Sequence, residues 1–325
     1  MSKPPANIHD AFFKRVMSEP DCAGRFLRER LPCEVAALLS DDSPELQSGS
    51  FVDEEMAQHQ TDLLFRLTLR EGGDALIYVL AEHKSAPDPL ARLQLLRYVT
   101  RILVHWHREN RRLPLPPVVP LIAHHGPSGW SFSTDFAEMY GDVADSLRPY
   151  LINFRHVLVD LVRIEDRNLS QYLRLRAFLM ALKYVFHVDL IDHIEDVLAD
   201  ATSLDRMDLG LVLQYIESGP VRIGREILLR TLRRLMPEKA EMLDGFFVKG
   251  YFDQVGREFF AKGKAEGNAE GKAEGKATSL IQVLELRFGP LAVSDRDRIL
   301  SSDVASIEGW MSRAVKENSL EAVFE

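Results

Sequence analysis

The sequence contains few cysteines, Cys22 and Cys33 alone among its 325 residues. Two thiols cannot build a disulfide framework or a four-thiolate zinc site, so we interpret both as small buried apolar residues. Long apolar runs are missing too, because none reaches the roughly 18 residues of a membrane span. The start, MSKPPANIHD, has no apolar signal-peptide core. We therefore expect a cytoplasmic protein that does not bind membranes.

The chain has no excess of positive charge, since 49 Asp and Glu residues oppose 40 Lys and Arg residues, giving a formal net charge of −9. This balance excludes a histone-like protein that coats nucleic acid indiscriminately, although local basic patches remain. The phosphate-binding motifs GxxxxGK[ST] and GxGxxG are absent, so nothing supports a nucleotide cofactor. The content of 46% apolar and 27% charged residues is typical of a folded globular protein.

Apolar periodicity predicts an α/β domain over residues 1–165. The expected elements are two short helices between residues 8 and 39, a half-buried strand at 61–69 (TDLLFRLTL), a strand at 75–81, a helix over 89–110, and strands at 118–123 and 157–162. The second strand is apolar on both faces, as expected of a central strand. The sequence Glu71-Gly72-Gly73 between the first two strands favours a hairpin connection.

Three regions are expected to follow this domain: a helical extension (166–255), a Lys/Ala/Glu/Gly repeat tether (256–279) and a small helical C-terminal unit (280–325). Each glycine of the repeat costs about 1 kcal/mol in a helix relative to alanine, which predicts a marginal helix or a flexible tether. The C-terminal unit is small enough that we expect it to lack an adequate core. It should therefore dock on the rest of the chain or on a second copy, forming a homo-oligomer in the latter case.

Two carboxylates and a lysine converge at one end of the predicted hairpin. Glu82 and Lys84 are two residues apart at the end of a strand, so both belong to one face. Asp62 lies in the neighbouring strand, and paired carboxylates suit Mg²⁺ or Mn²⁺. A nearby lysine can hold an attacking water. The alternative is a surface salt bridge, worth under about 1 kcal/mol.

The loop of the hairpin decides how these carboxylates face each other. A three-residue loop at 71–73 pairs Arg70 with Asp74 and puts Asp62 directly opposite Glu82. A two-residue loop makes the carboxylates diagonal, still within about 8 Å. Convergence is expected in both cases.

The helix over 89–110 carries a polar stripe at spacings of three and four residues. From 92 to 112 there are six arginines and a single glutamate. Such a stripe can follow a phosphate backbone, and the alternative is a solvated helix face. Its members are Gln94, Arg97, Arg101, His105 and Arg108, of which Arg97, Arg101 and Arg108 are the predicted DNA-binding residues.

In this order, these motifs resemble the PD-(D/E)XK nuclease superfamily and, within it, the Rpn family of recombination-promoting nucleases, also described as YhgA-like transposases. The matching stretches are HDAFFKRVMSEP (9–20), TDLLFRLTL (61–69), YVLAEHKS (78–85) and LQLLRYV (93–99). The resemblance implies a restriction-endonuclease-like mixed sheet flanked by helices. It also implies that Asp62 and Glu82 bind the metal, Lys84 assists the attacking water and Gln94 lies beside the site. Thr61 replaces the family's proline.

His9 and Asp10 match the opening motif of the family and either reach the metal or cap the first helix. The implied function is a metal-dependent DNA endonuclease that attacks the phosphodiester with water and promotes recombination. Two alternatives stay open: a non-catalytic DNA-binding or oligomerising module on a nuclease scaffold, and a strand-transfer transposase. His124 and His125 have no partners at zinc-motif spacing, so we interpret them as structural.

Overall fold

The computed structural model describes residues 8–47, 63–82, 87–111, 113–221, 223–239 and 280–324, the last range without 282, 286, 290, 301, 303 and 318. The chain divides into two compact units, Met1–Glu258 and Phe259–Glu325. Across these described ranges, no helix has the length and apolar character needed to cross a membrane.

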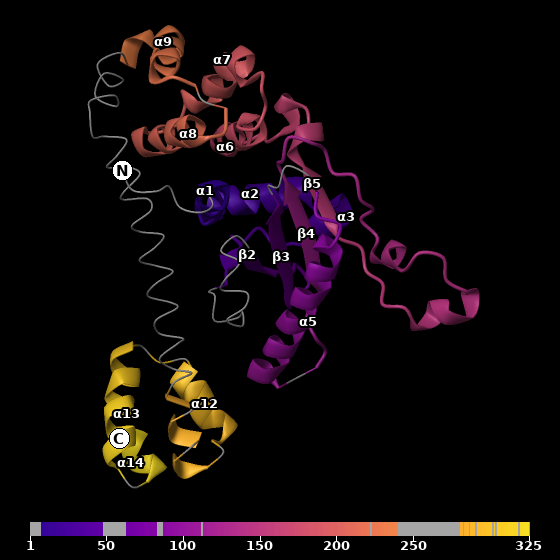
Figure 1. Cartoon of the computed structure of the whole chain (residues 1–325), viewed down its shortest axis with the longest axis vertical. Helices are drawn as coiled ribbons and strands as arrows, with labels where there is room; N and C mark the ends of the chain where they lie inside the picture. The colour runs from indigo at the N-terminus through magenta and orange to yellow at the C-terminus, as the bar shows by residue number, and fades with distance from the viewer. Residues whose placement is uncertain are drawn as a thin grey trace. The chain divides into compact units, whose positions relative to one another are not determined.

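The first unit is built on a mixed five-stranded sheet with the order β1-β2-β3-β4-β5 (Figure 1). β1–β2 and β2–β3 are antiparallel, whereas β3–β4 and β4–β5 are parallel. The predicted α/β fold with a mixed sheet is confirmed, and the two-residue β1 was not predicted. The strands are β1 (Glu45–Leu46), β2 (Leu63–Thr68), β3 (Asp74–Glu82), β4 (Val118–His124) and β5 (Val157–Asp160).

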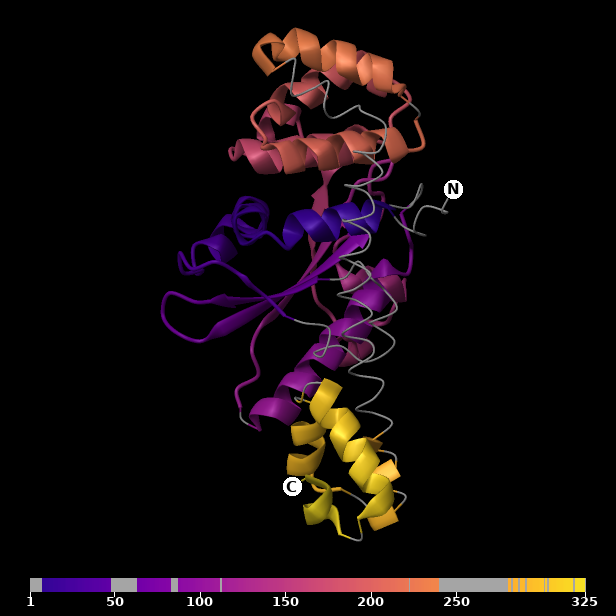
Figure 2. The ribbon, with the colours of Figure 1, turned by 90° about the vertical axis from the view of Figure 1, so that its left-hand side faces the viewer.

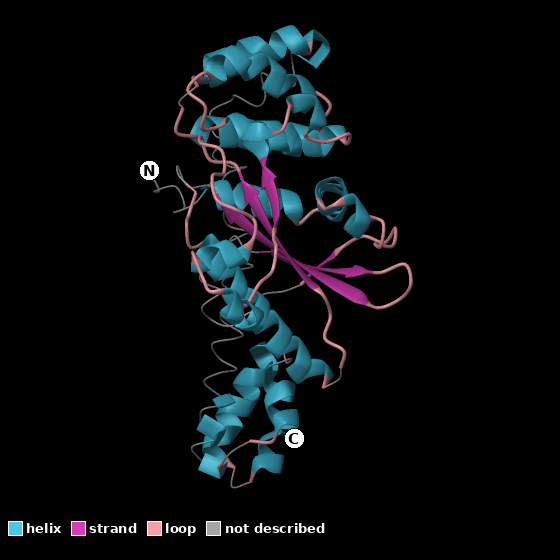
Figure 3. Cartoon of the chain, turned by 90° about the vertical axis from the view of Figure 1, so that its right-hand side faces the viewer, coloured by secondary structure: helices cyan, strands magenta, loops and turns pink. Residues whose placement is uncertain are grey.

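Helices cover both faces of this sheet. α5 (Ala91–Asn110) lies on one face, and α1 (Ile8–Met17) and α2 (Pro20–Arg30) lie on the other (Figures 2 and 3). Tyr78 of β3 packs in the cluster under α5, while Ile77, on the opposite face, is equally buried. This explains why β3 is apolar at every position between its first residue, Asp74, and its last, Glu82. Because β3 and β4 are parallel, α5 is the crossover between them and begins at the carboxyl end of β3.

The β2–β3 hairpin does not have the predicted direct register. Thr68, not Arg70, pairs with Asp74, so the expectation of a loop at 71–73 is wrong. The Leu69 N–H donates to the Gly73 carbonyl at 2.9 Å, which moves the loop one residue toward the N-terminus. Gly73 has a φ of 87°, a value that favours glycine. The register of the ladder therefore corresponds to the diagonal arrangement predicted for the two carboxylates, and not to the directly opposed one.

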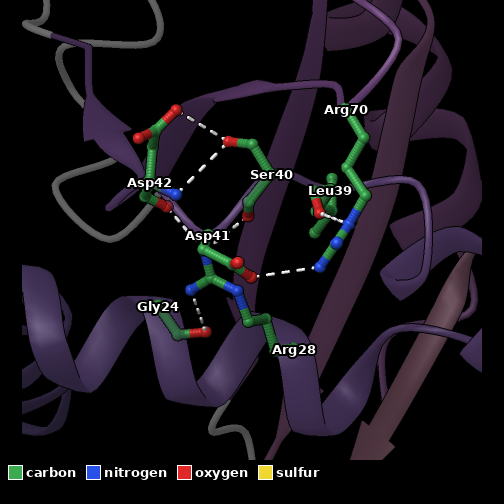
Figure 4. A network of polar contacts seen from close by, with 7 residues as sticks. All are labelled: Gly24, Arg28, Leu39, Ser40, Asp41, Asp42 and Arg70. Carbon is green, nitrogen blue, oxygen red and sulfur yellow. Dashed lines mark hydrogen bonds and ion pairs between the residues drawn. The ribbon is translucent and has the colours of Figure 1, made fainter.

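A polar network fixes this hairpin to the segment before β1 (Figure 4). Arg70 donates from Nε to the Leu39 carbonyl at 2.7 Å and pairs with Asp41 at 3.0 Å. From α2, Arg28 donates to the Ser40 carbonyl at 2.9 Å. Residues 38–40 also pair with the end of β2, on the side away from β3. The Ser40 N–H donates to the Thr68 carbonyl, and the Arg70 N–H donates to the Leu38 carbonyl. This pairing accounts for the shift of the loop.

The helical extension packs against α1 and α2. The Phe12 ring of α1 stacks on Tyr215 at 3.9 Å and meets Phe178 edge-on at 5.8 Å. The helices are α6 (Leu173–Tyr184), α7 (Leu190–Ala201), α8 (Arg206–Ser218) and α9 (Arg225–Leu235).

Shorter elements complete the first unit. α3 (Cys33–Ala36) begins at an exposed cysteine, so the expectation that both cysteines are buried holds for Cys22 alone. Burial raises the pKa of the Cys22 thiol to about 11. The 3₁₀ turns are η2 (Phe136–Tyr140), η3 (Asp145–Tyr150), η4 (Leu161–Arg163), η5 (Asp166–Asn168) and η6 (Pro237–Lys239).

The second unit contains α12 (Val293–Leu300), α13 (Val304–Lys316) and α14 (Leu320–Phe324), preceded by helical residues between 280 and 288. Contrary to expectation, it has a hydrophobic core of its own. The guanidinium of Arg298 lies 5.4 Å from the Trp310 ring and 4.9 Å from the Phe324 ring, covering part of that core. The buried residues are Leu280, Leu284, Leu291, Ile299, Ile307, Trp310, Ala314, Val323 and Phe324.

This core removes the physical reason for expecting the unit to dock elsewhere, because its apolar side chains already bury one another. A homo-oligomer through this unit stays a prediction. The repeat tether at 256–279 lies outside the described residues.

The pair between Arg174 and Asp208 should stabilise the junction of α6 and α8. The two side chains meet at 2.5 Å, and Asp208 is 6% exposed. Arg174→Ala leaves a buried carboxylate without its cation, so we expect it to lower the free energy of unfolding by about 2–4 kcal/mol. The control is Arg148→Ala, which breaks the exposed pair with Asp145 and should cost under about 1 kcal/mol. Urea unfolding of both variants measures the difference, and equal losses would contradict it.

Truncation before Gly263 should leave the first unit folded, because the core under α5 contains no residue from the second unit. We expect the truncated protein to unfold cooperatively on heating, as followed by circular dichroism. Its midpoint temperature should equal that of one of the transitions of the full chain. Loss of cooperative unfolding would show that the two units depend on each other. Light scattering of the same protein reports whether assembly requires the removed segment.

Candidate metal and nucleic-acid site

Three parallel strands end side by side at one edge of the sheet. Glu82 is the last residue of β3, and its register partner is His124, the last residue of β4. His124 is paired in turn with Asp160, the last residue of β5. Because α5 begins just after β3, its first turn belongs to the same edge. This edge therefore contains two positions of the predicted site, Glu82 at the end of β3 and Gln94 in the first turn of α5.

The predicted ligand set is only partly within the described residues. The backbone of Glu82 is described, whereas Asp62, Lys84 and the side chain of Glu82 are not. Where side chains are described, no group of three or more His, Cys, Asp or Glu residues is arranged to hold a metal. The metal site formed by Asp62 and Glu82 thus stays a prediction.

The loop after β4 is held tightly at this edge. The Trp130 N–H donates to Asp160 Oδ2 at 2.7 Å, and Arg163 donates to the Trp130 carbonyl at 2.8 Å. Arg163 Nε also lies 3.2 Å from Asp160 Oδ2. A Cβ added at Gly129 would meet Arg163 Nε at 2.8 Å, so a larger residue at this position would displace the Arg163 side chain. Asp160 and Arg163 together fix the loop that carries Trp130.

Arg92, in the first turn of α5, has a structural role. It is buried, and its guanidinium donates to the Asp135 carbonyl at 2.8 Å. Burial, reinforced by the positive charge of Arg92, lowers the pKa of His156 to about 4. His156 is therefore neutral near pH 7. One of the six arginines that made this helix basic thus belongs to the fold and not to a DNA-binding surface.

The polar stripe lies along the flank of α5 opposite Arg92, as its spacing requires at 100° per residue. Arg97 is exposed, lies 5.1 Å from the Tyr98 ring and donates to its hydroxyl at 3.3 Å. His105 pairs with Glu109 at 2.9 Å. Arg108 is exposed, and Arg101 and Gln94 are half-buried. Gln94 stands in the first turn, beside the strand ends.

His9 is joined to the helical extension. It lies within α1, where its Nδ1 is hydrogen-bonded to the Tyr215 hydroxyl at 2.8 Å. Its ring also lies 4.4 Å from Phe186 and 6.1 Å from His125. Asp10 is in the same helix, and its side chain is not among those described. A role for either residue at the metal stays a prediction.

The sequence did not identify His124 as a neighbour of Glu82. The sequence did contain a signal for this pairing. His124 ends an apolar run, and a strand joined to the Glu-x-Lys strand by a helix is expected to pair with it in parallel. Zinc-motif spacing could not reveal this neighbour, because the pairing joins residues 42 positions apart in the chain. Sheet register, and not local spacing, brings them together.

A mixed sheet with helices on both faces, and a Glu-x-Lys sequence leaving its central strand, defines a restriction-endonuclease-like protein. The family model described as "Putative transposase, YhgA-like" matches residues 7–209, more than half of the chain. The chain belongs to this YhgA-like family. The match covers the sheet, α5 and the extension as far as the start of α8.

Curated proteins from Escherichia coli are similar over the same region. Recombination-promoting nuclease RpnD of strain O157:H7 is 31% identical over 64% of this chain and 80% of its own length. Recombination-promoting nuclease RpnA of strain K12 is 29% identical over 65% of this chain and 72% of its own. A protein named inactive recombination-promoting nuclease-like protein RpnE is 27% identical over 58% of this chain and 62% of its own. No solved structure matches.

The stripe on α5 generates a test of DNA contact. If Arg97, Arg101 and Arg108 contact phosphates, replacing any one with alanine should weaken binding to all DNA sequences alike. It should also reduce the slope of log affinity against log salt by about 1. Arg148→Ala, on the 3₁₀ turn η3, is the control. Titrations at several salt concentrations measure the slope, and a slope unmoved by all three substitutions would make the stripe a solvated face.

Proposed function

We propose that this protein is a metal-dependent DNA endonuclease that hydrolyses phosphodiester bonds and promotes recombination. The observation that carries the proposal is the place of Glu82, the first residue of the Glu-x-Lys sequence, at the end of the central strand β3. In the sequence, Asp62 directly precedes β2, which is antiparallel to β3, and the proposal uses it as the second carboxylate. The names of RpnD and RpnA as recombination-promoting nucleases support the same function.

The chemistry of this edge suits a divalent cation. Glu82 pairs with His124, and His124 pairs in turn with Asp160. Among the described residues, His124 Nδ1 and Asp160 Oδ1 are buried and have no hydrogen-bond partner. Such electron-rich groups near carboxylates favour a cation or a water that donates to them. In the proposal, Asp62 and Glu82 hold Mg²⁺ or Mn²⁺.

A bound divalent cation supplies Lewis-acid stabilisation of the phosphoryl oxygens and makes water more acidic. The ammonium group of Lys84 orients the attacking water and stabilises charge that develops on the phosphate. The Gln94 amide, in the first turn of α5, positions that water or the scissile phosphate. Arg97, Arg101 and Arg108 hold the DNA backbone along α5.

One competing function has a specific observation in its favour. Relatives named inactive exist at 27% identity, so a non-catalytic DNA-binding module is a real alternative. This chain keeps Asp62, Glu82 and Lys84 together, whereas a site that has lost its function is expected to lose at least one of them. A strand-transfer transposase is compatible with the same residues, but nothing in the described residues pairs two DNA ends.

Asp62→Asn tests the metal site. The amide fits the space of the carboxylate but binds Mg²⁺ poorly, so we expect a folded protein that cleaves DNA about 100-fold or more slowly. Asp142→Asn is the matched control, because Asp142 is exposed and lies outside the sheet. Cleavage rates at equal concentrations of folded protein measure the effect. Full activity of Asp62→Asn would overturn the proposed function.

Lys84→Ala separates chemistry from metal binding. Removing the ammonium group should leave the affinity for Mg²⁺ nearly unchanged and slow cleavage by about 100-fold. Mg²⁺ binding by isothermal titration and single-turnover cleavage measure the two quantities independently. A large loss of Mg²⁺ affinity with normal cleavage at saturating Mg²⁺ would contradict the role given to Lys84.

A further inference from the structure

His124 occupies a special place in the row of strand ends. It is the register partner of Glu82 on one side and of Asp160 on the other. Residues paired across parallel strands belong to the same face of a sheet. His124 is fully buried at 0% exposure. An imidazole therefore lies inside the protein directly beside the position that the proposed function gives to a metal ligand.

The hydrogen bond of His124 determines which ring nitrogen carries a proton. Nε2 lies 2.7 Å from the Ser128 carbonyl oxygen. A carbonyl only accepts hydrogen bonds, so Nε2 must be the donor, and in the neutral ring Nδ1 holds a lone pair. Nδ1 is buried and has no hydrogen-bond partner among the residues that the structure describes. The result is an unsatisfied basic nitrogen next to a strand end that carries a carboxylic residue.

The surroundings keep this ring in place. The Trp130 indole packs edge-on against the His124 ring at 5.5 Å. The backbone on both sides of Trp130 is fixed by Asp160 and Arg163, as described above. Ser128 belongs to the same fixed loop. The structure thus holds both the tautomer and the orientation of the imidazole, which is the arrangement found around metal-binding histidines.

We propose that His124 Nδ1 is a ligand of the divalent cation held by Glu82. This deepens the proposed function and rests on it. In this proposal a cation, and not a proton or a water, satisfies the lone pair of Nδ1. An imidazole ligand also favours transition metals over Mg²⁺, which prefers oxygen, so this site should select Mn²⁺ over Mg²⁺.

Two substitutions distinguish the roles of the two ring nitrogens. His124→Gln can keep a donor to the Ser128 carbonyl but removes the nitrogen at Nδ1. His124→Asn places an amide oxygen near the Nδ1 position and thus replaces a nitrogen ligand with an oxygen ligand. His107→Gln, on the exposed face of α5, is the control. Circular dichroism of each full-length variant verifies that it is folded.

The probe is Mn²⁺ alone, bound to the full chain without DNA. Continuous-wave electron paramagnetic resonance gives the free Mn²⁺ concentration, and pulsed measurements detect ¹⁴N coupled to the bound ion. We expect ¹⁴N coupling in the wild type and in His107→Gln, and its loss in both His124 variants. His124→Gln should weaken Mn²⁺ binding by about tenfold or more and Mg²⁺ binding, measured by competition, distinctly less.

Several results would overturn this ligand assignment. Wild-type Mn²⁺ without ¹⁴N coupling would do so, and so would coupling that persists in His124→Asn, the variant to use if His124→Gln does not fold. Unchanged Mn²⁺ affinity in folded His124→Gln would mean that Nδ1 only accepts a hydrogen bond from a buried water. Asp62→Asn separates the two proposals. If it abolishes Mn²⁺ binding while His124→Gln does not weaken it, the proposed metal site stands without His124; if neither affects binding, both proposals fail.

Discussion

Burial of β3 on both faces is the constraint on which the rest of the first unit depends. A strand that is apolar on both sides needs a helical layer above and below it, which α5 on one face and α1 and α2 on the other provide. Its parallel pairing with β4 requires a crossover, so α5 must start at the carboxyl end of β3. The same requirement brings Glu82, His124 and the first turn of α5 to one edge. Fold and candidate site therefore have a single origin.

The helical extension takes part in this arrangement. Tyr215 of α8 stacks on Phe12 and is hydrogen-bonded to His9, so the first helix is held between the sheet and the extension. The pair between Arg174 and Asp208 joins α6 to α8 inside that extension. The family match, which continues past the sheet to residue 209, agrees with this packing. The second unit buries a hydrophobic core of its own.

Sequence patterns predicted the strands and α5 because their apolar periodicity is strong and local. They missed β1, because two residues carry no periodicity, and they misplaced the β2–β3 loop, because pairing by residues 38–40 shifted it. The stripe on α5 was predictable from spacing, but the burial of Arg92 was not, since its partner Asp135 is 43 residues away. The pairing of His124 with Glu82 was missed for the same reason. Contacts set by sheet register leave no trace in local spacing.

The central claim is that carboxylates at the end of β3 and before β2 hold a cation that cuts DNA. The most direct measurement is the conversion of supercoiled plasmid to nicked circles by the purified full-length protein, first in EDTA and then after Mg²⁺ is restored in excess. The account predicts no nicking in EDTA, nicking after Mg²⁺ addition, and none by folded Asp62→Ala under either condition. Nicking in EDTA, or equal nicking by Asp62→Ala, would contradict it.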